Sequence, residues 1–260
     1  MTSGKKARQQ RRTPPPPVRS TGGPRKASPK VLAVGAGVIL LSGIVAAAAI
    51  ALTRGSSSPS STSTTKLLGS AEVLALYRGI PQHGNVLGSP KAPVRLIEYI
   101  DLQCPVCREF ETTVMPSIVP RYVRTGKVQV IARPIAFIGP DSVTGRLAAL
   151  AAAKQNHFFD FSQLLYANQG TENTGWLNDS IISAAYNSIP GLDRQAAEQA
   201  RASSEVSSEA NTFDSQATAD KVQGTPTVLV GKHGGPLTFV GPGSPSVATL
   251  EAALNKSLAQ

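Results

Sequence analysis

The chain has 260 residues, 41% of them apolar, so it can form one sizeable folded domain with further segments around it. The formal net charge of +10 is unevenly spread: residues 1–30 hold nine Lys or Arg and no acid, while residues 31–260 hold seventeen basic and sixteen acidic side chains. A nearly neutral body excludes the broad basic surface that nucleic-acid binding requires, and no nucleic acid is expected among the partners.

The N-terminal segments predict a membrane-anchored protein. Residues 1–30 are basic and Pro-rich, and the 22 residues from Val31 to Leu52 are apolar and uncharged, which is long enough to span a bilayer. The positive-inside rule then places the tail in the cytoplasm and the rest of the chain outside, at the cell membrane. A cleavable signal peptide is the alternative, although the apolar stretch is longer than usual for one. Residues 53–66 are rich in Ser and Thr and predict a flexible linker.

The folded part begins with a short helix predicted over Ser70–Tyr77, followed by a turn-rich stretch. Residues 94–101 are largely apolar and β-branched and predict a buried strand. After the next turn, residues 108–124 predict a helix with an apolar stripe at a spacing of four. Pro116 and Pro120 lie inside this helix, so a kink or break is expected there.

The only two cysteines of the chain, Cys104 and Cys107, lie at the turn between this strand and this helix. Pro105 suits the first helical position, which puts Cys104 at the helix start and Cys107 one turn further. Unpaired N–H groups and the helix dipole at this end favour a thiolate, so the pKa of Cys104 is expected to fall below that of a free thiol. One sulfur can then attack a disulfide while the other resolves the mixed disulfide.

Other uses of the pair fit the sequence less well. A zinc site needs two further ligands, but there is no second cysteine pair and the three histidines are scattered, so no metal is expected. A purely structural disulfide between residues this close would restrict the unfolded chain little. A Cys–His hydrolase would need a distant histidine and would leave Cys107 without a role.

The remaining elements complete a small α/β core with a helical insertion. A second strand over 127–137 is expected to run parallel to the first through the helical crossover. Residues 141–220 are mostly helical, with a break at Pro190 and Gly191. A strand over 228–230 then pairs with one over 237–240, and Ser246 caps the final helix. The predicted division is a tail at 1–30, an anchor at 31–52, a linker at 53–66, a core at 67–140 and 221–260, and an inserted helical domain at 141–220.

Three features together resemble the DsbA-like thioredoxin family, in particular its membrane-anchored Gram-positive members. They are the segment from Glu98 to Cys107, which ends in Cys-Pro-Val-Cys, the helical insertion, and the segment Gly224-Thr225-Pro226-Thr227 about 120 residues later. The resemblance covers about residues 70–260. It implies a thioredoxin-like α/β fold with an inserted helical domain.

The resemblance also implies the roles of individual residues. Cys104 matches the nucleophile and Cys107 the resolving thiol. Thr225 and Pro226 match the loop that faces the disulfide, where the family has a cis-proline and binds an extended substrate strand. Glu98 matches a buried acid; we expect it to have a raised pKa and to relay a proton to or from Cys107, unless it is an edge-exposed carboxylate.

Two further residues near the cysteines, Asp101 and Val106, also carry expectations. Asp101 is assigned only a turn or capping role. Val106 departs from strongly oxidising relatives, which often carry His there, so only the backbone and the helix dipole would stabilise the Cys104 thiolate and a milder oxidant is expected.

The predicted function is extracytoplasmic thiol–disulfide oxidoreduction that forms disulfides in exported cysteine-containing proteins, with no dissociable cofactor. A quinone-linked membrane partner would reoxidise the pair, by family analogy. A reductase or isomerase, and a non-catalytic peptide-binding or chaperone module on the same fold, remain as alternatives.

Overall fold

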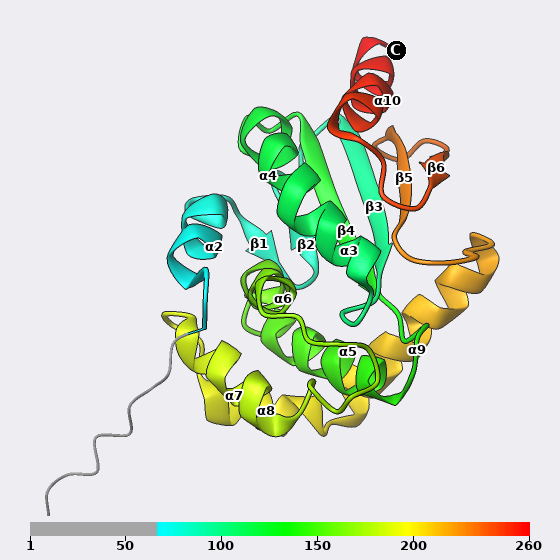
Figure 1. The fold of residues 1–260 in the computed structure, drawn as a ribbon. Coiled ribbons are helices and arrows are strands. Elements are labelled where there is room, and N and C mark those ends of the chain that lie inside the picture. The colour runs from blue at the N-terminus through cyan, green and yellow to red at the C-terminus, as the bar shows by residue number, and fades with distance from the viewer. Residues whose placement is uncertain (1–66) are drawn as a thin grey trace, which may run out of the picture. The chain divides into compact units, whose positions relative to one another are not determined.

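The computed structural model describes residues 67–260, and Figure 1 shows a central sheet with helices around it. The basic tail, the predicted anchor and the linker lie outside the described residues. Within residues 67–260, none of the helices combines the length and the apolar character that crossing a membrane requires. The strands are β1 (Gln82–His83), β2 (Val86–Leu87), β3 (Val94–Ile100), β4 (Val128–Pro134), β5 (Thr227–Lys232) and β6 (Thr238–Pro242).

The sheet has the strand order β1-β2-β4-β3-β5-β6, which puts β3 at its centre. β3 pairs in parallel with β4, as predicted, and antiparallel with β5. Its apolar side chains are buried, as expected for a strand covered on both faces. Because side chains alternate along a strand, Glu98 and Ile100 point to one face of the sheet and Tyr99 to the other.

The helices are α2 (Ser70–Tyr77), α3 (Pro105–Glu109), α4 (Met115–Ile118), α5 (Pro140–Ala153), α6 (Phe158–Ala167), α7 (Asp179–Ser188), α8 (Arg194–Arg201), α9 (Ser204–Ala219) and α10 (Val247–Ala259). Five of them, α5 to α9, lie between β4 and β5 in the chain, as predicted for the helical insertion. Residues 67–260 form a single compact unit. The predicted boundaries between the core and the helical insertion therefore remain a prediction.

The helix predicted over 108–124 begins at Pro105 and is interrupted twice. Two π-helical segments, η1 (Phe110–Val114) and η2 (Val119–Val123), alternate with α3 and α4. Pro116 and Pro120 have no N–H to donate to the preceding turn, so the regular hydrogen-bond ladder cannot continue through them. This segment, α3–η2, packs with α10 on the same face of the sheet, where Tyr122 donates a hydrogen bond to Asn255.

Most helix ends follow local capping chemistry. Ser246 caps α10 as predicted, since its hydroxyl accepts a hydrogen bond from the N–H of Thr249. The first helix, α2, has no side-chain cap: Gly69 occupies its cap position, and the Ser70 hydroxyl donates to the Leu67 carbonyl.

Candidate active site

The two cysteines lie where the sequence predicted them. Cys104 is the N-cap of α3, its backbone is extended (φ −70°, ψ 118°), and Pro105 is the first helical residue. The N–H of Cys107 donates to Sγ of Cys104 over 3.3 Å, so the sulfur takes the place of the usual capping oxygen. This bond directs one of the unpaired donors of the helix start at the Cys104 sulfur.

The two sulfurs occupy different environments. Both cysteines are free; Cys104 keeps 5% of its surface exposed and Cys107 none. The pKa of Cys104 is lowered to about 6, chiefly by a hydrogen bond from the Cys107 thiol. Burial acts against this shift, while Thr225 and the backbone N–H groups of Cys107 and Val106 add to it. Burial, followed by the bond to Cys104, raises the pKa of Cys107 well above its ordinary value. The expectation that only backbone and dipole would stabilise Cys104 was wrong, because the neighbouring thiol contributes most.

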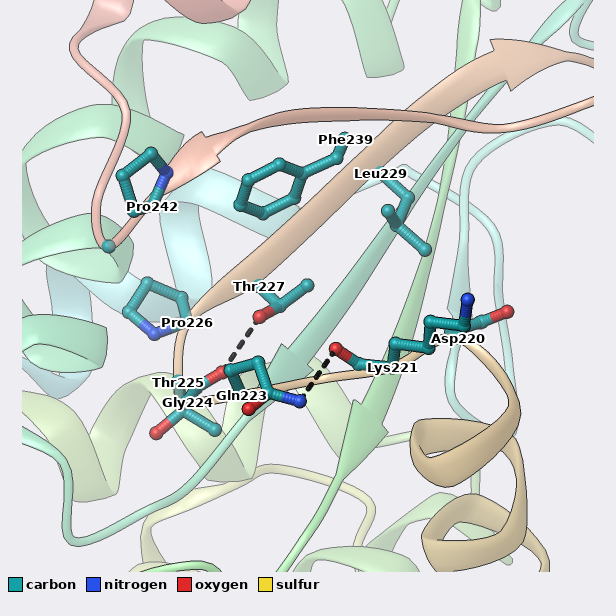
Figure 2. Close-up of a pocket in the computed structure, with 11 residues that line it drawn as sticks. Asp220, Lys221, Gln223, Gly224, Thr225, Pro226, Thr227, Leu229, Phe239 and Pro242 are labelled. Atoms are coloured by element: carbon teal, nitrogen blue, oxygen red, sulfur yellow. Dashed lines mark hydrogen bonds between the residues drawn. The ribbon is translucent and has the colours of Figure 1, made fainter.

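The segment that the resemblance placed opposite the disulfide does lie there. The Thr225–Pro226 peptide bond is cis, and the Cys104 thiol donates to the Thr225 carbonyl over 3.3 Å. Figure 2 shows this loop with the Thr227 hydroxyl bonded to the Gly224 carbonyl, a contact of 2.7 Å that closes the turn before β5. Residues 121 positions apart in the sequence thus form one site.

Glu98 is buried rather than edge-exposed, and it has a partner that the sequence reading missed. Glu98 on β3 and Glu111 on η1 are both buried, and each carboxyl influences the pKa of the other. Burial raises the pKa of Glu98 to about 8 and that of Glu111 well above its ordinary value. One oxygen of each carboxyl has no hydrogen-bond partner. Glu111 stands four residues after Cys107 on the apolar side of the helix, and that position was the available signal.

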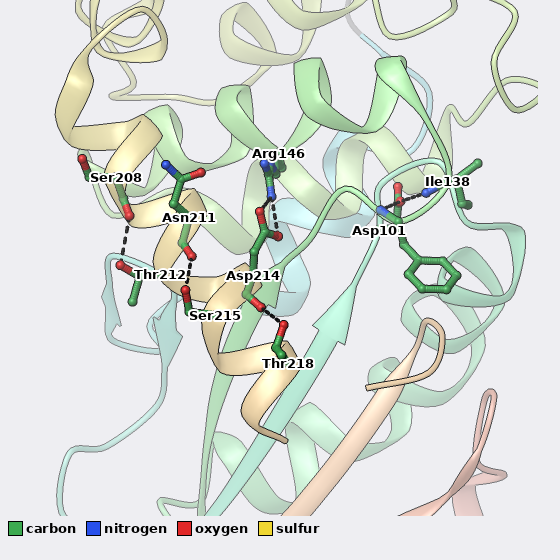
Figure 3. Close-up of polar contacts among 10 residues, drawn as sticks. Asp101, Ile138, Arg146, Ser208, Asn211, Thr212, Asp214, Ser215 and Thr218 are labelled. Carbon is green, nitrogen blue, oxygen red and sulfur yellow. Dashed lines mark hydrogen bonds and ion pairs between the residues drawn. The ribbon is translucent and has the colours of Figure 1, made fainter. Parts of the chain in front are cut away.

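Asp101 has the turn role assigned to it, and more. One carboxylate oxygen accepts from the N–H of Gln103 over 2.9 Å, and the other accepts from the N–H groups of Phe137 and Ile138 over 2.8 and 2.9 Å. Figure 3 shows Asp101 bonded to Ile138 in the loop after β4. Asp101 therefore joins the cysteine turn to the start of the helical insertion.

The insertion holds the same turn through side chains that no sequence pattern indicated. The Gln169 amide donates to the carbonyls of Leu102 and Cys104 over 3.0 and 3.2 Å. The Tyr166 hydroxyl donates to the Asp101 carbonyl over 3.1 Å. The buried Gln103 side chain exchanges hydrogen bonds with Asn173. Because these partners are 65 to 70 residues away in sequence, only the fold brings them together.

No group of three or more metal-ligating side chains occurs within residues 67–260. What the site contains is a pair of free thiols at a helix start, one of low pKa, beside a cis-proline loop on a mixed sheet. This fold and this site define a thiol–disulfide oxidoreductase. A family model described as thioredoxin matches residues 82–241, and the chain belongs to that family.

Relatives with assigned names agree with this class. The chain is 33% identical over 147 residues to the probable disulfide bond formation protein D of Bacillus cereus, covering 55% of this chain and 68% of the relative. It is 27% identical over 157 residues to disulfide bond formation protein D of Bacillus subtilis, covering 56% and 66%. The resemblance to DsbA-like proteins seen in the sequence is thereby confirmed.

Solved structures share the fold. Oxidised BdbD of Bacillus subtilis superposes with a TM-score of 0.60 at 20% identity, covering 70% of this chain and 98% of that chain. The α-DsbA1 protein of Wolbachia pipientis gives a TM-score of 0.58 at 20% identity, covering 67% and 90%. At these identities the likeness establishes the DsbA-like fold alone.

Proposed function

We propose that this oxidoreductase forms disulfides in exported cysteine-containing proteins by passing on a disulfide between Cys104 and Cys107. The observation that supports it most directly is the outer position and low pKa of Cys104. A thiol of low pKa is a good leaving group and stabilises the reduced pair, so the oxidised pair is driven to give up its disulfide.

The exchange proceeds in two steps. A client thiolate attacks Sγ of Cys104, the Cys104–Cys107 bond breaks, and its electron pair leaves on Cys107. A second client thiolate then attacks the client sulfur of the mixed disulfide, and Cys104 leaves as a thiolate. The client ends oxidised and the cysteine pair reduced. The Thr225 carbonyl, next to the Cys104 sulfur, supports pairing with an extended client segment beside the cis-proline Pro226.

Cys107 must take up a proton when it leaves, because its buried sulfur disfavours the thiolate. We assign the supply of this proton to Glu98, acting with Glu111. Both carboxyls are buried and hold protons more tightly than ordinary glutamates, and Glu111 is four residues from Cys107 along the helix. Glu98→Gln tests the assignment: exchange rates that stay unchanged from pH 5 to pH 9 would remove it.

We further propose that the protein acts outside the cytoplasm, anchored by residues 31–52, with a quinone-linked membrane protein restoring its disulfide. The basic tail before the apolar run and the two cysteines in a single redox pair support this location. Accessibility of an engineered tag at each end of the chain in intact cells tests the topology. A protected C-terminal tag would overturn it.

The direction of exchange is tested by the reduction potential of the purified protein and by the redox state of the pair in cells. We expect a potential above roughly −200 mV and an oxidised pair. A potential near the −270 mV typical of thioredoxin, with a reduced pair in cells, would favour the reductase or isomerase instead. Val106, which offers no side-chain donor to Cys104, is the feature that favours that second function. A protein that stays active with both cysteines changed to Ser would be a binding module.

A further inference from the structure

Three side chains form a hydrogen-bonded cluster at the end of α9, outside the cysteine turn. The Tyr99 hydroxyl on β3 donates to Oδ2 of Asp220 over 2.6 Å, and Nη1 of Arg133 on β4 donates to the same oxygen over 3.0 Å. The Arg133 guanidinium also lies over the Tyr99 ring, 5.2 Å from its centroid, where the aromatic face attracts a cation. We call these three residues the Asp220 cluster. It joins the last helix of the insertion to two strands of the core.

The cluster is a fixed point because its members are largely buried and depend on one another. Tyr99 is fully buried, and the side chains of Arg133 and Asp220 keep only part of their surface exposed. Burial, followed by the hydrogen bond to Asp220, raises the pKa of Tyr99 to about 12, so the hydroxyl keeps its proton and stays a donor near neutral pH. Removal of the shared carboxylate would leave a buried hydroxyl without its acceptor, which is costly.

The loop between α9 and β5 is attached to Tyr99 at both of its ends. At one end the Tyr99 side chain holds Asp220, and at the other the Tyr99 backbone is the partner of Thr227 in the register of β3 and β5. Figure 2 shows Asp220 and Thr227 at the two ends of this loop. Thr225 lies between them, with its carbonyl 3.3 Å from Sγ of Cys104. The place of the Thr225 backbone therefore depends on two attachments to one residue of the central strand.

The cluster lies away from the reacting sulfurs. Along β3 the side chains alternate, so Tyr99 points to the face of the sheet opposite Glu98. Glu98 lies on the side of the helical segment that carries the cysteines, where it influences Glu111 of η1. The Asp220 cluster can act on the cysteine pair only through the loop, which makes its members positioning residues.

We propose that the Asp220 cluster holds the Thr225 backbone against Sγ of Cys104, so that an extended client segment finds its pairing partner already in place. A loop that is ordered before the client arrives loses less conformational entropy on binding than a loose one, and this raises the affinity of pairing. The inference deepens the proposed client pairing at Thr225 and rests on it.

The test compares two thiols as reductants of the oxidised full-length protein. One is a short unstructured peptide with a single cysteine among Ala, Gly and Ser, which has a backbone to pair with Thr225. The other is 2-mercaptoethanol, which has none. Each rate constant is divided by that of the same thiol with glutathione disulfide, which cancels intrinsic thiol reactivity. The ratio of the two normalised rates is the peptide preference, and we expect it to exceed one in the unmodified protein.

Asp220→Leu should lower the peptide preference about fivefold, the effect of losing one backbone hydrogen bond to the client. Tyr99→Phe removes only a hydroxyl, so it should lower the preference less, and it decides the question if Asp220→Leu does not fold. Asp220→Asn should retain most of the preference, because its amide oxygen still accepts from Tyr99. The matched control is Asp214→Leu, which breaks an ion pair of 2.7 Å with Arg146 elsewhere on α9 (Figure 3) and should leave the preference unchanged.

A second measurement follows the loop itself. Hydrogen–deuterium exchange of residues 221–227 should accelerate about tenfold in Asp220→Leu, because the loop has lost one of its attachments, and should not change in Asp214→Leu. Equal effects of the two Leu variants on exchange and on the preference would mean general destabilisation and would overturn the inference. An unchanged preference in both Asp220→Leu and Tyr99→Phe would overturn it as well.

The same data separate this inference from the function on which it rests. If the unmodified protein prefers the peptide and the cluster variants keep that preference, the cluster has no positioning role and client pairing at Thr225 stands. If the unmodified protein shows no peptide preference, client pairing at Thr225 fails, and the inference fails with it.

Discussion

The outer and inner sides of the cysteine turn have opposite chemistry. On the outer side, Cys104 receives hydrogen bonds from Cys107, and its pKa falls to about 6. On the inner side, Cys107, Glu98 and Glu111 are buried without cations to pair with, and their pKa values rise. The comparison teaches that a single turn can favour a thiolate and neutral acids a few residues apart, because hydrogen bonds outweigh burial at Cys104 while burial dominates at Cys107, Glu98 and Glu111.

The largest expected effect comes from exchanging the two sulfurs for oxygen one at a time. Cys104→Ser should abolish attack on a client disulfide, because the buried Cys107 has a raised pKa and little access to solvent. Cys107→Ser should still form mixed disulfides with clients and accumulate them, because the resolving sulfur is missing. Mass spectrometry of trapped species checks this, and accumulation in Cys104→Ser would show that the inner sulfur attacks.

Asp101 and Glu98, the two acids near the end of β3, are tested by their effects on the free energy of unfolding. Asp101→Ala leaves the N–H groups of Gln103, Phe137 and Ile138 without their acceptor, and should lower the unfolding free energy by about 3 kcal/mol. Urea unfolding measures the loss. The control is Asp141→Ala, which removes a single contact to the N–H of Gly175 at the surface and should cost well under half as much. Equal costs would contradict the anchoring role of Asp101.

Glu98 should make stability depend on pH in the opposite sense to a paired carboxylate. Its folded pKa, about 8, lies above the ordinary value of 4.5, so the folded state holds a proton that the unfolded state releases. The contribution of Glu98 to stability is therefore complete below pH 4.5 and is lost as the pH rises toward 8, by up to about 1.4 kcal/mol per pH unit for one proton.

Glu98→Gln should reduce this decline when unfolding free energies at pH 5 and pH 8 are compared. Glu109→Gln, which changes an exposed glutamate at the end of α3, should leave the decline as it is. A decline of the same size in Glu98→Gln would show that Glu98 ionises normally in the folded protein.

The smallest expected effect comes from the hydrogen bonds between Gln169 of the helical insertion and the cysteine turn. Gln169→Leu removes the donors to the Leu102 and Cys104 carbonyls and should cost about 1 kcal/mol of stability. Because the turn that directs the Cys107 N–H at Cys104 loosens, the pH midpoint of Cys104 alkylation should rise above about 6. Gln155→Leu, which breaks comparable contacts to the Asp193 backbone, should lower stability without moving that midpoint. A shared shift in both variants would contradict the local role.

Local signals in the sequence were sufficient for much of the fold. The apolar run over 94–101 predicted β3, and the helix Ser70–Tyr77 was predicted with the bounds of α2, because both signals lie within a few neighbouring residues. The prolines at 116 and 120 predicted an interruption, since a missing N–H acts within one turn. The pairing of β1 with β2 was missed, because strands of two residues leave no periodic pattern.

The residues of the candidate site also fall into those predicted from the sequence and those found only in the structure. Cys104 and Cys107 came from spacing, and Thr225 and Pro226 came from a family resemblance. Glu111 and Gln169 emerged only from the structure, since their importance depends on contacts with Glu98 on β3 and with the Cys104 carbonyl.

The sequence by itself determined the redox pair, its position at a strand-to-helix turn and the order of the elements, because these depend on neighbours within a few residues. Only the tertiary structure decided which groups surround the pair: the Thr225 carbonyl from 121 residues away and the Glu98–Glu111 pair. Proton affinity and client access depend on burial and on distant partners, and these quantities exist only once the chain is packed.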